Sequence, residues 1–136
     1  MASQTDSKKE TKDKNTADNQ ELILQLEKQV SIALWIQFIG QIMEAILLSK
    51  IASISEEVRS DPNERQIIQG AWFQTIGQFM ESMGATQQVM TTDENIRKET
   101  QNITTLGDWI QAVGTVLEAH GGSQIIVEEE KRESDT

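Results

Sequence analysis

Residues 70–84 read GAWFQTIGQFMESMG, and the chain contains two near-copies of this segment. They are ALWIQFIGQIMEAIL at residues 33–47 and GDWIQAVGTVLEAHG at residues 107–121. The only tryptophans in the chain stand at the third position of each segment, 37 residues apart: Trp35, Trp72 and Trp109. Three copies at a constant period, without a gap, indicate an internal repeat.

Each segment has the periodicity of an amphipathic helix. Counting from each tryptophan, apolar residues recur after four, seven and eight positions, whereas glutamine, threonine or glutamate occupies positions two, six and nine. This spacing places the apolar residues on one side of a helix and the polar residues on another. We therefore expect the apolar stripe to form the core of a helix bundle, with corresponding positions filled by Trp35, Trp72, Trp109, Ile39, Ile76 and Val113.

Capping residues predict where the helices begin and end. Asp61 stands before Pro62, a pair typical of a helix N-terminus. Asp93 or Thr92 can start the next helix, while glycines at 84 and 121–122 resemble C-terminal stops. We expect an all-α antiparallel bundle with helices near residues 19–59, 62–83 and 94–120. A fourth helix would result if the first one breaks, near Val30 or Ser49.

The two ends of the chain are almost free of large apolar residues. Such segments bury too little surface to offset the entropy of ordering. The composition therefore predicts a disordered polar arm over residues 1–18 and a disordered acidic tail over 128–136. Between them, we expect a helical repeat domain over residues 19–122, with the copies near 20–56, 57–93 and 94–127.

Charge and composition exclude several classes of function. The 136 residues carry a net charge of −10, which argues against nucleic acid as a partner. The chain has one histidine and no cysteine, so no nucleophile–base pair can be assembled, and no motif for a cofactor is present. Glu44, Glu81 and Glu118 lack the Glu-x-x-His pairs of carboxylate metal sites in bundles. We expect a cytoplasmic protein that is not an enzyme and needs neither metal nor cofactor.

The glycines of the chain also recur at a regular spacing. Two series of glycines are spaced by seven residues, at 70, 77 and 84 and at 107, 114 and 121. A glycine inside a helix costs about 1 kcal/mol relative to alanine, so the repetition suggests a gain elsewhere. We predict a seam at which two helices pack closely, formed by Gly40, Gly70, Gly77, Gly107 and Gly114. The alternative is a tolerated glycine that duplication copied.

The polar positions also recur with the same residue types. Two interpretations are open: a solvated face that was copied by duplication, which we favour, or a surface that binds a partner or a second copy. The residues of this stripe are Gln37, Gln41, Glu44, Gln74, Gln78, Glu81, Gln111 and Glu118.

The third segment, WIQAVGTVLEA at residues 109–119, resembles a group of uncharacterised bacterial "repetitive proteins", seen in Bacillus and its relatives, that carry tandem Trp-Ile-Gln-Ala-Val/Ile-Gly motifs. The resemblance implies a bacterial origin and assigns no activity.

Two functions remain after these exclusions. The first is a non-enzymatic helical repeat protein that acts by self-association or by binding another protein. The second is a membrane-associated or membrane-active protein, because residues 30–48, VSIALWIQFIGQIMEAILL, are apolar enough to insert. Glu44 within this segment disfavours a lipid environment.

Overall fold

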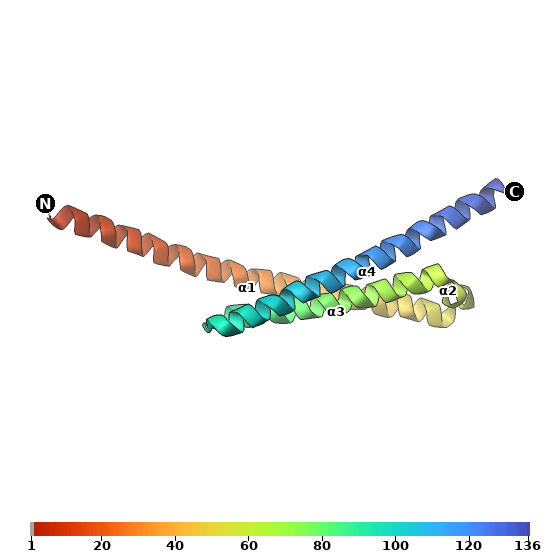
Figure 1. The fold of residues 1–136 in the computed structure, drawn as a ribbon, viewed down its shortest axis with the longest axis horizontal. Helices are drawn as coiled ribbons and strands as arrows, with labels where there is room; N and C mark the ends of the chain where they lie inside the picture. Colours follow the sequence, from red (N-terminus) through yellow and green to blue (C-terminus); the bar gives the residue numbers. More distant parts are fainter. Residues whose placement is uncertain (1) are drawn as a thin grey trace.

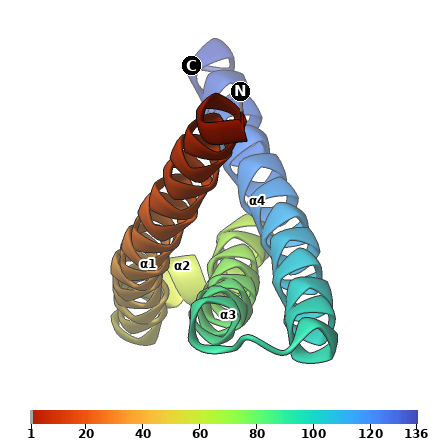
Figure 2. The same cartoon turned by 90° about the vertical axis from the view of Figure 1, so that its left-hand side faces the viewer.

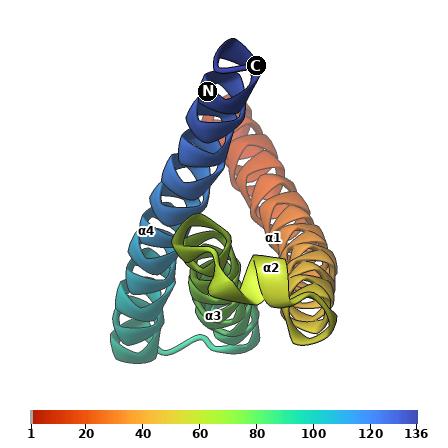
Figure 3. The same ribbon diagram turned by 90° about the vertical axis from the view of Figure 1, so that its right-hand side faces the viewer.

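The computed structural model describes residues 2–136, and nearly all of them are helical (Figure 1). The elements are α1 (Ala2–Ile54), α2 (Glu56–Ser60), α3 (Pro62–Met90) and α4 (Glu94–Ser134). Within the described chain, α3 packs against both α1 and α4, whose own backbones do not approach each other. End-on views place α3 between the two longer helices (Figures 2 and 3). The all-α, antiparallel class is therefore confirmed.

Short side chains with oxygen acceptors start the later helices. Ser55 Oγ accepts a hydrogen bond from Val58 N at the start of α2. Asp61 Oδ1 accepts from Asn63 N, 2.8 Å away, with Pro62 in the first turn of α3. Asp93 caps α4 in the same way. These acceptors satisfy backbone N–H groups that have no partner within the helix.

Glycines 84 and 121 do not end helices. The helix α3 continues through Gly84 to Met90, beyond the expected end at residue 83, so that only residues 91–93 separate it from α4. Likewise, α4 passes through Gly121 to Ser134. Both glycines are buried at the contact between α3 and α4, so close packing is what requires them. The break after the first long helix lies at Ser55.

Both ends of the chain extend the long helices beyond the packed body. The start of α1 and the end of α4 project in opposite directions (Figure 1). Residues 4–26 are exposed throughout. The composition of both ends predicts disorder, whereas here they continue the helices, because a helix satisfies its backbone hydrogen bonds locally. Asp18, which resembles a cap with Glu21 in the sequence, lies inside α1.

Removal of residues 1–18 is expected to leave the packed body intact. The described side chains of this segment are exposed, so their loss removes no tertiary packing. Thermal melts of the full-length and shortened proteins, followed by circular dichroism, should have midpoints within a few degrees of each other. A larger fall would mean that the arm packs on the body.

Candidate interaction surface

The glycines bring α3 and α4 into direct backbone contact. A Cβ atom added to Gly70 would lie 2.5 Å from Gly114 O and 2.9 Å from Glu118 N. A Cβ atom added to Gly107 would lie 2.6 Å from Gly77 O. No side chain fits at these four positions without moving the helices apart, which is the close packing that the seven-residue spacing predicts.

The first glycine of the predicted seam is not part of it. A Cβ atom on Gly40 would meet nothing within 4 Å. Gly40 is exposed on α1, and α1 packs against a different side of α3 through other residues, among them Ser31. Only the two series of glycines on α3 and α4 therefore form the seam.

Polar side chains line the same contact between α3 and α4. Gln74 Nε2 donates to a carboxylate oxygen of Glu118, and Gln111 Nε2 donates to Glu81 Oε2 at 2.7 Å. These two amide–carboxylate pairs run in opposite directions between the antiparallel helices. Four residues of the recurring polar stripe therefore form contacts between helices rather than a solvated face. They are Gln74, Glu81, Gln111 and Glu118.

The contact between α1 and α3 is also polar. Gln78 is only 1% exposed, and its Nε2 donates to Leu34 O at 3.2 Å. Thr75 Oγ1 lies 3.2 Å from Gln41 O, to which it can donate. The Gln41 side chain has a buried oxygen, Oε1, without a hydrogen-bond partner among the described residues. The other two stripe members, Gln37 and Glu44, are exposed.

Three hydrogen bonds meet at the Thr86 hydroxyl group. Its Oγ1 accepts from Trp35 Nε1 at 2.9 Å and donates to Ser82 O at 2.8 Å. Ser31 Oγ lies 2.9 Å from the same oxygen. A hydroxyl group has one donor and two acceptor positions. All three positions of the Thr86 hydroxyl group are therefore occupied. Sequence periodicity did not single out Ser31, Ser82 or Thr86, although Ser82 follows Thr75 by the same seven residues that separate the glycines.

The predicted core requires a correction, because most of its residues face outward. Trp109 is 69% exposed, and Ile39, Ile76 and Val113 are each about half exposed. Trp72 is 38% exposed, and its Nε1 donates to Ser49 Oγ. Trp35 is more fully covered, through its contact with Thr86 and the neighbouring rings.

The physical reason lies in the size of the residues at the seams. Glycine, serine and threonine allow helix backbones to approach until there is no room for larger side chains between them. The only buried hydrophobic residues in the described chain are Ala45 and Ala71. Many bulky apolar residues are therefore left exposed beside the contacts between the helices.

Exposed apolar residues of α1 and α3 form a surface that spans the contact between these two helices. Phe79 of α3 connects it to α1, because its ring centroid lies 5.4 Å from that of Phe38 and 6.0 Å from that of Trp35. We call this surface the apolar face; its exposed members include Ile32, Ile36, Ile39, Met43, Ile46, Trp72, Phe73, Ile76, Phe79 and Met83.

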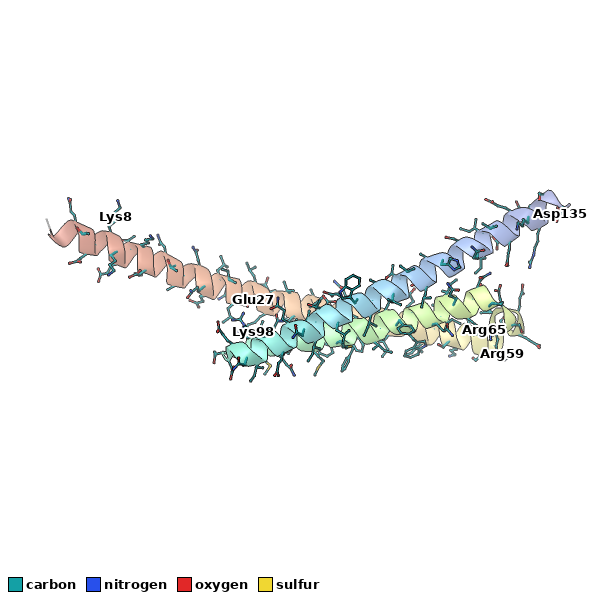
Figure 4. All side chains as sticks on the ribbon, viewed as in Figure 1. Lys8, Glu27, Arg59, Arg65, Lys98 and Asp135 are labelled. Carbon is teal, nitrogen blue, oxygen red and sulfur yellow. The ribbon has the colours of Figure 1, made fainter. Side chains whose placement is uncertain are left out.

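Charged residues gather beyond the ends of the apolar face. Arg59 and Arg65 lie at the α2 end of the body, whereas Glu27 and Lys98 lie at the opposite end (Figure 4). None of the members of the apolar face is charged. A surface of this kind, apolar in its middle and bounded by charge, is typical of a site that another molecule covers.

Glu118 is the titratable group whose environment differs most clearly from water. Partial burial raises its pKa above the ordinary value of 4.5, against the opposing hydrogen bond from Gln74. The Glu44 carboxyl group of α1 raises the pKa further. Glu44 and Glu118 therefore face each other from the two helices that flank α3.

Glu118→Gln is expected to stabilise the protein at neutral pH. Because the folded pKa lies above 4.5, the carboxyl group contributes stability that is fully present below that pH and is lost as the pH rises through the folded pKa. The amide keeps an acceptor oxygen for Gln74 and carries no charge. Melting midpoints of the variant should exceed those of the wild type at pH 7 and approach them at pH 4. Equal differences at both pH values would contradict this assignment.

The remaining polar groups of the described chain form no recognisable catalytic arrangement. His120 Nδ1 lies 2.8 Å from Gln66 Nε2, and Gln66 Nε2 also donates to Leu117 O. His120 thus belongs to the contact between α3 and α4. Among the residues that the structure describes, no three carboxylate, imidazole or thiol groups gather as metal ligands would.

Comparison with known proteins gives one family. A model described as a family of unknown function, DUF6944, matches residues 65–133. This region covers nearly all of α3 and α4, and so contains the complete glycine seam. No curated protein and no solved structure matches the chain.

Proposed function

The chain belongs to the DUF6944 family, whose function is unknown, and from its geometry we propose a non-enzymatic helical protein that acts by association, burying its apolar face against another protein surface. The observation that carries this proposal is the inverted distribution of side chains: hydrogen-bonded and small residues between the helices, large apolar residues outside. The resemblance of residues 109–119 to bacterial repetitive proteins supports a bacterial origin.

The size of the apolar face supports a protein partner. Its members are large side chains with roughly half of their surface exposed, which amounts to on the order of 1,000 Å² in total. Monomeric proteins rarely expose contiguous apolar patches beyond a few hundred Å². A stable protein–protein interface buries about 800 Å² on each side. The area therefore fits an interface and exceeds what a free monomer in water usually tolerates.

Photo-crosslinking in the native cells tests association directly. A benzophenone amino acid at position 76 would lie on the apolar face, while the same group at position 115 would lie on an exposed polar side of α4. We expect a protein adduct from position 76 and none from position 115. The absence of a protein adduct at position 76, or equal adducts at both positions, would overturn the proposal.

Membrane association is the second candidate, and α1 favours it. Among the described residues, α1 is a helix long and apolar enough to cross a membrane, and little of its apolar window is buried. Residues 30–48 would insert in this case. Flotation with lipid vesicles tests the candidate, with Ile36→Glu as the variant that should abolish binding. Wild-type protein that stays at the bottom of the gradient would exclude it.

A further inference from the structure

The exposed side of α3 is a regular stripe. Its members follow each other at intervals of three or four residues, the spacing that keeps side chains on one side of a helix. The other sides of α3 are occupied, since glycines contact α4 and Thr75 and Gln78 contact α1. All members of this stripe, which we call the α3 stripe, are exposed: Gln69, Trp72, Ile76, Phe79, Met83 and Gln87.

The α3 stripe is nearly symmetrical about the point between Ile76 and Phe79. Moving outward from that point, Trp72 corresponds to Met83, and Gln69 corresponds to Gln87. A helix with this pattern is complementary to itself in the antiparallel direction. Trp72 of one copy would meet the flexible Met83 of the other, a favourable sulfur–aromatic pair. Gln69 and Gln87 would meet at both ends, where their amides can hydrogen-bond.

We propose that a second copy of this chain covers the α3 stripe, with the two α3 helices antiparallel about a twofold axis between Ile76 and Phe79. This inference rests on the proposed function, and it specifies the partner as a second copy of the chain. A twofold arrangement closes on itself and leaves no further apolar stripe on α3 exposed. Since no member of the α3 stripe is charged, no like charges meet in the interface.

Charge favours a second copy over a lipid surface as the occupant. Helices that lie on membranes usually carry lysine and arginine on their polar side. The helix α3 has one basic residue, Arg65, against the two acids Glu64 and Glu81.

Disulfide trapping tests the direction of the pairing. The chain has no cysteine, so Gln69→Cys and Gln87→Cys each introduce a single thiol and leave the apolar part of the α3 stripe unchanged. In the antiparallel dimer, positions 69 and 87 of different copies are adjacent. The two positions 69 are separated by about 27 Å along the helix, at about 1.5 Å per residue.

Oxidation of a mixture of the two variants should therefore give a covalent dimer, and either variant alone should give at least tenfold less. Non-reducing electrophoresis measures the difference. Gln69→Cys alone forming as much covalent dimer as the mixture would show parallel helices and overturn the proposal. Failure of all three samples to form a dimer would overturn it as well.

Sedimentation equilibrium tests whether a second copy binds at all. The wild type is expected at twice the chain mass of 15.3 kDa. Ile76→Glu places a charge on the α3 stripe and should weaken dimerisation at least tenfold. Ile126→Glu makes the same change at an exposed position near the projecting end of α4 and should leave the dimer intact. Circular dichroism checks that each variant is folded.

Together, these experiments distinguish binding of a second copy from association with a different protein. A monomeric wild type would overturn the proposal that a second copy covers the α3 stripe. A dimer that Ile76→Glu and Ile126→Glu weaken equally would overturn it too. If position 76 still gives a protein adduct in cells, and that adduct contains a different protein, the proposed function stands while the second copy fails. If position 76 gives no protein adduct, both fail.

Discussion

Gly77→Ala is expected to destabilise the protein by about 1–3 kcal/mol, the usual cost of overpacking a close contact, although alanine is the better helix former. The new Cβ atom would lie 2.8 Å from Gln111 N and still closer to Gly107 O. Because these neighbours are backbone atoms, they yield only if α4 moves away from α3. Gly77→Leu should cost more, since the whole side chain must fit into the same gap.

Gly40→Ala provides the matched control for this prediction. Both glycines are five residues after a tryptophan and both lie inside a helix, yet Gly40 has open space around it. Alanine at position 40 should therefore stabilise the protein by up to about 1 kcal/mol through helix propensity alone. Urea denaturation at one fixed protein concentration measures both variants. Stabilisation by both substitutions would show that α3 and α4 are not in backbone contact at Gly77.

Thr86→Val is expected to cost about 1–3 kcal/mol, the penalty for leaving a buried polar group without a partner. Valine has the shape of threonine and lacks the hydroxyl group that accepts from Trp35 Nε1. The indole N–H group and the hydroxyl group of Ser31 would then lose their partner between α1 and α3. The volume of the side chain and its branching at Cβ stay the same, so packing and helix propensity change little.

Thr105→Val is the control for the hydroxyl group. Thr105 Oγ1 donates only to Gln101 O of its own helix, and its side chain is exposed. Its loss should change the free energy of unfolding by less than about 0.5 kcal/mol. Equal stabilities of the Thr86→Val and Thr105→Val proteins would mean that the Thr86 hydroxyl group does not hold α1 to α3.

The local features of the fold could be predicted from the sequence because each depends on a few adjacent residues. Asp61 with Pro62 and Asp93 start helices as their types suggest. The glycine register identified the contact between α3 and α4 because only a residue without a Cβ atom allows so short a distance. The same register includes Gly84 and Gly121, which explains why these glycines pack inside helices instead of ending them.

The side of each helix that faces inward could not be predicted from the apolar pattern. A helix with both an apolar stripe and a stripe of small and amide residues has two faces that can pack, and periodicity treats them alike. The hydrogen bonds decided the outcome: Gln74, Gln78 and Gln111 each reach an oxygen atom on a neighbouring helix. Those partners lie 30 or more residues away in the chain, beyond the reach of local patterns.

Among the residues whose burial the structure describes, just two hydrophobic ones, Ala45 and Ala71, are buried, and this affects how the protein should respond to heat. The heat-capacity increase on unfolding reflects the apolar surface that water newly hydrates, about 12–15 cal/mol/K per residue for an ordinary globular chain. A single folded copy already leaves much of that surface in water, so its own unfolding should give a smaller increment. If a second copy covers the α3 stripe as proposed, part of the heat-capacity increase would come from separating the two copies, and the stability should rise with protein concentration.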